Sequence, residues 1–126
     1  MPFINKKLIY IIQEHWATHH HFDLRLQIGN ILKSWAIPKQ PPEKEEEKRL
    51  AVETEDHALE YGKFEGLIPE GMYGVGKVKI WDKGFYEPEE IADKKIVVNI
   101  KGKKLKGKYC LIKFKGKNWL FFKRKA

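Results

Sequence analysis

Residues 13–26 concentrate the side chains that could do chemistry, because four of the chain's five histidines, an aspartate and an arginine lie in this segment. In an extended strand, successive side chains point to opposite faces. One face of such a strand would carry His15, His19, His21, Asp23 and Arg25, and the other would carry Phe22, Leu24 and Leu26. The alternation therefore predicts a strand with one chemical face and one core face.

The chemical face has the residue types of a metal site. Two imidazoles and a carboxylate suit a divalent metal of intermediate hardness, such as manganese, iron or zinc, and leave coordination positions open for water or substrate. Arg25 adds a fork of donors that matches a phosphate or a carboxylate. A histidine run can also be a solvated strand face, but the regular alternation with apolar residues favours a site.

A second polar segment lies at residues 50–61. Glu53, Glu55 and His57 share one parity there, and Tyr61 follows four positions later. A barrel could bring this face and the first one into a single cleft. Glu55 could then orient a histidine by a hydrogen bond, while His57 and Tyr61 could bind or protonate a phosphate oxygen.

Length and composition predict one domain over residues 1–126, large enough to bury a single core. The single cysteine, Cys110, cannot form an internal disulfide, and its apolar surroundings predict a core position. The chain therefore suits a reducing compartment, and we expect a cytoplasmic protein. No apolar run approaches the roughly 18 residues of a membrane span, so we expect no membrane association.

The formal net charge of +8 is unevenly distributed. Residues 1–93 hold 12 Lys or Arg and all 17 Asp or Glu, whereas residues 94–126 hold 13 Lys or Arg and no acidic residue. Such a basic surface predicts contact with nucleic acid. An exposed aromatic residue in this region could stack on an unpaired base, although most of these aromatics are expected in the core. The candidates are Tyr109, Phe114, Trp119, Phe121 and Phe122.

Short β-branched and aromatic segments separated by turn residues predict a mainly β fold, a small and largely antiparallel β-barrel with little helix. The expected strands are 8–12, 19–28, 31–37, 50–55, 77–81, 96–100, 109–115 and 119–123. Gly29 and Asn30 suit a tight hairpin, residues 41–49 a solvated loop or one helical turn, and residues 82–84 a turn. Tight turns, rather than nucleotide binding, are expected at Gly71, Gly74 and Gly76, because no Lys-Ser/Thr pair and no helix follow them.

Several blocks of the chain resemble the 3′-phosphoesterase domain of bacterial DNA ligase D. They occur in the expected order over about residues 10–88. They are Gln-Glu-His-Trp-Ala-Thr at 13–18, His-Phe-Asp-Leu-Arg at 21–25, Leu-Lys-Ser-Trp-Ala-Ile-Pro-Lys at 32–39, Lys-Arg-Leu-Ala-Val-Glu-Thr-Glu-Asp-His at 48–57, Glu-Tyr at 60–61, the glycine-rich block 65–76, and Trp-Asp at 81–82.

This resemblance implies a β-barrel enzyme of DNA end repair. With manganese, or another divalent transition metal, it would remove a 3′-terminal ribonucleoside as a phosphodiesterase and the resulting 3′-phosphate as a phosphomonoesterase. Its substrate would be a DNA 3′ end, such as a primer-template with a 3′-terminal ribonucleotide. The resemblance assigns the metal to His15, His21 and Asp23, the phosphate to Arg25, His57 and Tyr61, and supporting or substrate-binding roles to Gln13, Lys39, Arg49 and Glu55. These roles agree with the parity argument but do not follow from it.

The chain also departs from the family pattern. Only residues 1–7 stand where family members carry an acidic, arginine-containing segment, and histidines occupy positions 19 and 20, where other residues are usual. His19 is thus a spare candidate ligand. The length leaves no room for fused ligase or polymerase domains, so we expect a stand-alone monomer that meets such partners in trans.

Two other classes of protein fit part of the sequence. His21 and Asp23 with the distant His57 also match the facial triad of non-haem iron oxygenases, in which His57 would displace His15. A noncatalytic nucleic-acid-binding barrel would explain the basic C-terminal region alone, but it leaves both polar faces without a role.

Overall fold

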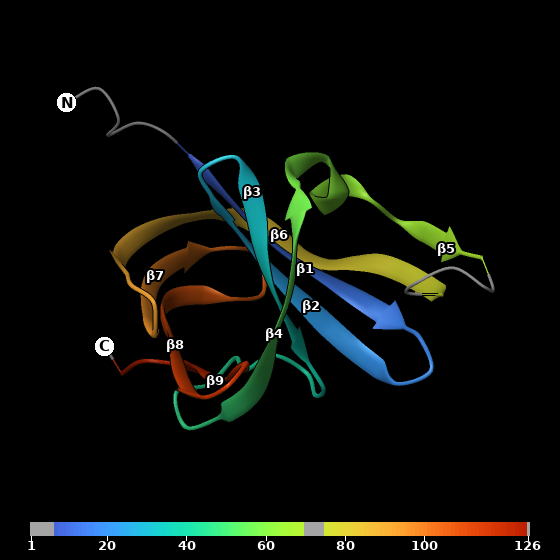
Figure 1. Cartoon of the computed structure of the whole chain (residues 1–126). Helices are drawn as coiled ribbons and strands as arrows, with labels where there is room; N and C mark the ends of the chain where they lie inside the picture. The colour runs from blue at the N-terminus through green and yellow to red at the C-terminus, as the bar shows by residue number, and fades with distance from the viewer. Residues whose placement is uncertain (1–6, 70–74, 126) are drawn as a thin grey trace.

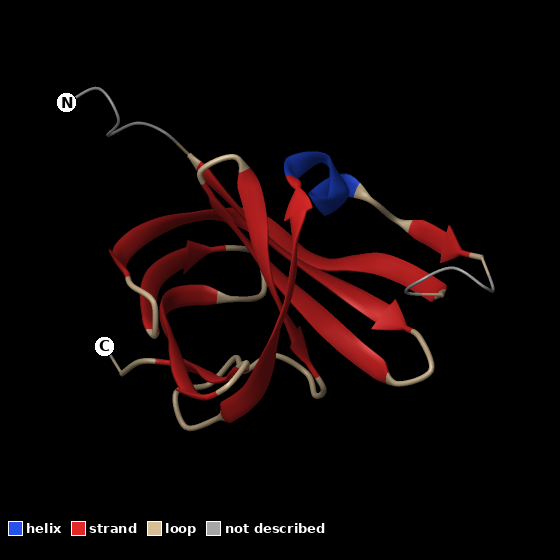
Figure 2. Cartoon of the chain, in the orientation of Figure 1, coloured by secondary structure: helices blue, strands red, loops and turns tan. Residues whose placement is uncertain are grey.

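The computed structural model describes residues 7–69 and 75–125, which are almost entirely β-strand (Figures 1 and 2). The strands are β1 (Leu8–Trp16), β2 (His20–Ile28), β3 (Ile31–Ile37), β4 (Lys48–Ala58), β5 (Gly66–Ile68), β6 (Gly76–Ile91), β7 (Lys95–Lys101), β8 (Lys106–Lys115) and β9 (Asn118–Lys123). A 3-10 turn, η2 (Leu59–Lys63), follows β4. Within the described ranges, no helix has the length and apolarity of a membrane span.

Eight strands close into an antiparallel barrel. Their order is β1-β2-β3-β4-β9-β8-β7-β6, and β6 pairs back onto β1. The short β5 is added at the start of β6, outside this ring. Closure leaves each of the eight strands with two neighbours, which removes the free edges that invite aggregation. The prediction of a mainly β, largely antiparallel barrel with little helix is confirmed.

Several strands are longer than their sequence signals indicate. β1 continues to Trp16 and β4 to Ala58, and β5 was not expected. The turn predicted at residues 82–84 is wrong, because β6 runs without interruption from Gly76 to Ile91. Gly84 instead permits a close approach of strands: a Cβ there would lie 2.1 Å from the backbone oxygen of Lys101. Pairing with two partners therefore overrides the local turn signal in β6.

The glycine prediction is confirmed at Gly29, whereas Gly76 has the expected positive φ but begins strand β6 instead of forming a tight turn. Gly29 has φ of +62° in the two-residue connection between β2 and β3, which confirms the tight hairpin. Gly76 has φ of +126°, and a Cβ there would lie 2.2 Å from the backbone oxygen of Trp16. Both positions therefore need glycine. Gly71 and Gly74 lie outside the described residues.

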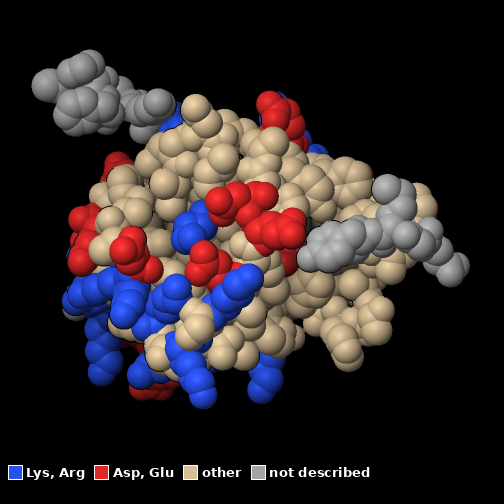
Figure 3. Space-filling view, in the orientation of Figure 1, with Lys and Arg blue, Asp and Glu red and all other residues tan. Residues whose placement is uncertain are grey.

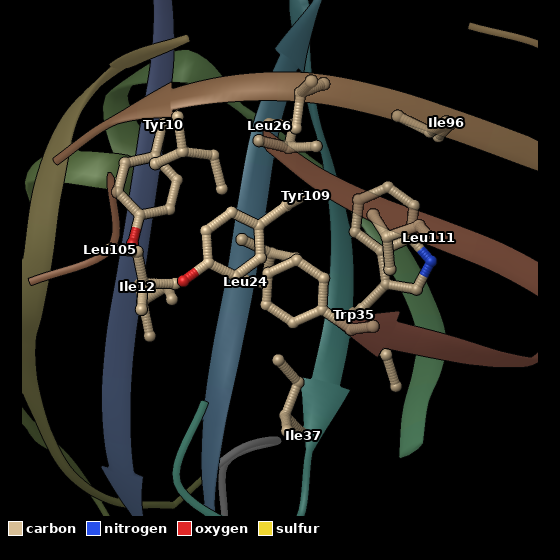
Figure 4. Close-up of a cluster of buried hydrophobic side chains, with 14 of the residues drawn as sticks. Tyr10, Ile12, Leu24, Leu26, Trp35, Ile37, Ile96, Leu105, Tyr109 and Leu111 are labelled. Carbon is tan, nitrogen blue, oxygen red and sulfur yellow. The ribbon is translucent and has the colours of Figure 1, made fainter. Parts of the chain in front are cut away.

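The hydrophobic core fills the interior of the barrel (Figure 4). Trp35 of β3 and Trp119 of β9 are buried and meet edge to face, with ring centroids 5.6 Å apart. Tyr109 and Phe121 are also fully buried, so most aromatics of the basic C-terminal third belong to the core, as expected. The core position of Cys110 is confirmed, and burial raises the pKa of its thiol.

A buried carboxylate organises one end of the barrel. Asp82 of β6 is 4% exposed and accepts the Tyr10 hydroxyl at 2.8 Å. It also accepts the backbone N–H groups of Lys103, Lys104 and Leu105 at 2.9, 3.1 and 3.0 Å. These four hydrogen bonds offset the loss of hydration of the carboxylate. Asp82 thus joins β1, β6 and the turn between β7 and β8.

We predict that Asp82→Ala lowers the free energy of unfolding by about 3 kcal/mol, because it leaves buried donors without an acceptor. Urea denaturation monitored by circular dichroism measures this change. Asp93→Ala, at an exposed acidic position, is the matched control and should stay within about 0.5 kcal/mol of the wild type. Equal unfolding midpoints for the two variants would contradict the role given to Asp82.

Candidate active site

The polar face of the β1–β2 hairpin lies on the outside of the barrel wall. Cross-strand pairs place His15 opposite His21 and Gln13 opposite Asp23, and directly opposed residues share one face of a sheet. Alternate residues, such as Leu24, belong to the core inside the barrel. The site is therefore built on the reverse side of the strands that enclose the core.

A pocket of about 340 Å³ opens on this outer face. Its walls come from β1 to β4 and from η2. It is lined by His15, Ala17, His21, Asp23, Arg25, Ala36, Thr54, Glu55, His57 and Tyr61. The fold thus brings seven of the ten predicted site residues into one pocket.

Three of these residues form a candidate metal triad. One nitrogen each from His15 and His21 and an oxygen of Asp23 lie within 4.8 Å of one another. His21 Nε2 is 3.3 Å and His15 Nδ1 is 3.9 Å from Asp23 Oδ2. The triad contains His15 and does not contain His57. This is the ligand set of the phosphoesterase interpretation, whereas the oxygenase interpretation requires His57.

The chemistry of the donors fits a cation. His21 Nδ1 is 2.8 Å from the backbone oxygen of His19, and since a carbonyl only accepts, Nδ1 carries the hydrogen. Nε2 then presents a lone pair towards Asp23. His15 Nδ1 is the ring nitrogen near Asp23, and Nε2 is buried without a hydrogen-bond partner, so no hydrogen bond at Nε2 fixes the tautomer of this ring. His19 itself contributes its backbone, not its ring, to this arrangement.

Protonation of His21 is coupled to the same carboxylate. The hydrogen bond to Asp23 raises the pKa of His21 above its ordinary value, and burial and the charge of Arg25 oppose this rise. A proton on His21 and a cation in the triad would use the same lone pair. Metal binding is therefore expected to release a proton and to weaken as the pH falls through the raised pKa of His21.

Arg25 is a buried cation at the base of the pocket, with 3% of its surface exposed. Its Nε donates to Gln13 Oε1 at 2.5 Å and its Nη1 to Ser34 Oγ at 2.8 Å, while Nη2 lies 3.5 Å from Asp23 Oδ2. The Tyr61 ring packs on the guanidinium, 4.7 Å from its central carbon. Burial lowers the pKa of Arg25 and Asp23 opposes that change. The guanidinium group of Arg25 is thus held in place by hydrogen bonds at its edge and by the Tyr61 ring on its face.

Gln13 supports this arrangement without lining the pocket. It is fully buried, and its Nε2 donates to the backbone oxygens of Tyr61 and Phe64 at 2.9 and 3.1 Å. Its Oε1 accepts from Arg25. One amide therefore fixes the segment after β4 onto β1 and orients the arginine.

His57 and Tyr61 form one wall of the pocket. Their rings stack with centroids 4.5 Å apart, and Phe64 continues the stack 5.6 Å from Tyr61. Burial, with the positive charge of Arg25 as a further cause, lowers the pKa of His57. His57 is therefore neutral at pH 7, with one ring nitrogen as donor and the other as acceptor.

The parity predicted for β4 is wrong at one position. Glu53 pairs with Trp35, and its carboxylate accepts from Trp119 Nε1 at 3.0 Å, on the core side of the strand. The register between β3 and β4 shifts next to this pair, so that Thr54 and His57 face the pocket together. A β-bulge of this kind changes which residues share a face.

Two predicted supporting residues lie elsewhere. Lys39 is exposed in the bend after β3 and does not line the pocket. Arg49 donates from Nε to the backbone oxygen of Gln40 at 2.6 Å and lies 3.7 Å from Glu47, so it closes the loop before β4. Glu55 does line the pocket, from an exposed position.

Sequence reasoning missed Ser34, which is fully buried and bridges Arg25 to the backbone oxygen of Leu32. The available signal was its place directly before Trp35 in a mostly apolar strand segment. A lone serine in that context indicates a buried hydrogen bond, but it does not indicate the partner.

Residues 13–113 match the family described as the DNA Ligase D 3′-phosphoesterase domain. The chain belongs to this family. The matched range contains every residue of the pocket.

Curated relatives agree. The multifunctional non-homologous end joining DNA repair protein LigD of Mycobacterium tuberculosis (strain H37Rv) is 46% identical over 115 residues, which cover 88% of this chain and 15% of that protein. Multifunctional non-homologous end joining LigD proteins of Mycolicibacterium smegmatis and Pseudomonas aeruginosa are 47% and 42% identical, over 92% and 94% of this chain. The chain spans only 15–17% of the length of these three relatives.

We predict that manganese stabilises the wild type but not His21→Ala. A ligand at about one hundred times its Kd adds roughly 2.7 kcal/mol to the folded state, and removal of one of three ligands should abolish this gain. Thermal unfolding with and without MnCl₂ measures it. His57→Ala is the matched control, because it removes a pocket histidine outside the triad. Loss of the manganese effect in His57→Ala alone would favour the oxygenase-like ligand set.

Proposed function

We propose that the chain is a manganese-dependent DNA 3′-end-processing phosphoesterase. It removes a 3′-terminal ribonucleoside and then the 3′-phosphate that this step leaves. The observation that carries the proposal is the meeting of a histidine, histidine and aspartate triad with a buried arginine in one pocket. Membership of the ligase D 3′-phosphoesterase family supports it.

His15, His21 and Asp23 would hold the metal, which supplies a Lewis acid and a template for the phosphate when bound. Arg25 binds a nonbridging phosphate oxygen and neutralises the charge that develops there. Because Gln13 and Ser34 already orient the guanidinium, little reorganisation is needed when the substrate arrives.

His57 is placed to move a proton. In the free protein its pKa is lowered, but the negative charge of a phosphodiester bound beside Arg25 would offset that positive charge and raise the pKa of His57. Protonated His57 would then protonate the leaving oxygen of the ribonucleoside. Tyr61 lies against both groups and keeps them in position.

The relatives are named as non-homologous end joining proteins, and we extend that context to this chain. Its substrate would be a primer-template with a 3′-terminal ribonucleotide. Ligase and polymerase activities would act on the same ends, supplied by other polypeptides or by other parts of a longer chain.

We predict that the protein shortens a primer with one 3′-terminal ribonucleotide in the presence of manganese, that chelation abolishes this activity, and that magnesium supports it poorly. Electrophoresis of end-labelled primers distinguishes the hydroxyl and phosphate products. Full activity in chelator would contradict the proposal.

Substitutions in the pocket should separate the two steps. Arg25→Ala should lose both, because both require charge neutralisation. His57→Ala should keep manganese and lose at least one step by on the order of a hundredfold, the usual contribution of a general acid. A fully active His57→Ala would remove the proton-transfer role.

The basic C-terminal region supplies a surface for DNA. Figure 3 shows Lys and Arg side chains gathered at the end of the barrel where Figure 1 places β8 and β9. Some of these cations are already paired with acids of β6: Lys95 with Glu90, Lys101 with Glu87 and Lys108 with Glu89. The lysines at the β8–β9 turn, Lys115 and Lys117, are exposed.

We predict that a triple change of Lys113, Lys115 and Lys117 to glutamine weakens DNA binding and flattens its salt dependence, by up to about 0.9 in the logarithmic slope for each lost phosphate contact. Single-turnover cleavage at saturating enzyme should be unchanged. The matched control changes Lys95, Lys101 and Lys108, whose charges are paired with β6, and should alter the slope less. Equal slopes in all three proteins would place the β8–β9 turn away from the DNA.

A further inference from the structure

We propose that the tip of the β1–β2 hairpin stacks the unpaired overhang of the strand complementary to the one whose 3′ end lies in the pocket. The stacking surface, here called the Trp16 platform, consists of Trp16, His20 and Lys77. This inference rests on the proposed function, because it assumes a DNA end in the pocket.

The Trp16 platform lies on the other face of the hairpin from the metal triad. Trp16 follows His15 directly in β1, so their side chains point to opposite faces. Trp16 is paired across the sheet with His20 of β2 and with Lys77 of β6. Its ring stacks on His20 at 5.5 Å and 13°, and Lys77 Nζ lies 5.4 Å from the ring centroid.

The same face continues as an aromatic and basic strip. Phe22 is buried and offers no stacking surface of its own, but it supports the His20 ring, at 5.2 Å, and the partly buried Trp81 ring, at 5.7 Å. Lys104 Nζ lies 4.4 Å from the Trp81 centroid. Glu14 is the acid of this face, and its carboxylate is engaged by His20 at 2.7 Å. Interleaved aromatic rings and cations are the pattern that binds single-stranded nucleic acid.

Trp16 is 39% exposed, although it is large and apolar. An exposed lysine over a tryptophan is a weak contact, whereas base stacking on an aromatic ring is stronger. A nucleobase would therefore displace the flexible Lys77, whose ammonium would be free to pair with a phosphate. The occupant that matches both the ring and the cation is an unpaired nucleotide.

The position of the pocket decides which strand supplies that nucleotide. Ala17, which follows Trp16, lines the pocket with His15 and His21. The pocket and the Trp16 platform thus lie on two sides of a hairpin that is one sheet thick. The DNA strand whose 3′ end lies in the pocket occupies one side of the hairpin. The complementary DNA strand, which continues beyond that 3′ end, is therefore the one that reaches the Trp16 platform on the other side. The hairpin tip would separate the two strands.

The test is binding, measured in chelator so that no turnover is needed. The DNA is a duplex with 2-aminopurine at the first unpaired position of the template overhang, whose fluorescence falls when the base stacks. We expect quenching by the wild type, and affinity for this duplex roughly 5- to 100-fold weaker in Trp16→Ala. Affinity for a blunt duplex should not change.

Phe85→Ala is the matched control, since Phe85 of β6 is a 43% exposed aromatic with a lysine, Lys7, 5.1 Å from its ring centroid, and it should bind both duplexes as the wild type does. Trp16→Phe should retain most of the quenching, which separates loss of stacking from loss of folding. Equal loss on blunt and overhanging DNA, or no quenching by the wild type, would overturn the proposal. Absence of metal-dependent cleavage together with normal quenching would instead contradict only the proposed enzymatic function.

Discussion

Strand β1 is the element on which the rest of the structure depends. From Tyr10 to Trp16 it is hydrogen-bonded to β2 on one side and to β6 on the other, so its backbone has no freedom to adjust. Its inward side chains build the core and its outward ones, Gln13 and His15, build the pocket. A one-residue change of register would exchange these two sets, and for that reason the fold and the site cannot be specified separately.

The cost of burying Arg25 explains how the pocket wall is assembled. A buried guanidinium is tolerated only where its donors are satisfied. Gln13 and Ser34 meet that need and Asp23 supplies the opposite charge. Because Gln13 also holds the backbone after β4, the group that solvates the arginine fixes the segment that carries Tyr61. The pocket wall that carries Tyr61 and the candidate metal triad are therefore joined in one network through Arg25.

The sequence was most informative where local periodicity and tertiary position coincide. In β2, strict alternation separates Asp23 and Arg25 from Leu24 and Leu26, and the structure keeps that division. Prediction failed where the local structure depends on contacts with residues that are distant in the sequence. The bulge that turns Glu53 away from His57 depends on the fit of β4 against β3, and the length of β6 depends on its two neighbours. Arg49 was assigned by resemblance, and its side chain reaches from β4 to the backbone oxygen of Gln40 in the preceding loop rather than into the pocket.

The closing contact of the barrel also has a consequence for how the chain folds. The hydrogen bond between Tyr10 and Asp82 joins residues 72 positions apart, whereas every residue of the pocket lies between His15 and Tyr61. Contacts of long sequence separation form slowly because of the entropy of loop closure. The strands that line the pocket can thus pair with one another before β6 pairs with β1. During synthesis, the edge of β1 remains open until most of the chain has emerged, and it is then the edge most exposed to mispairing with another molecule.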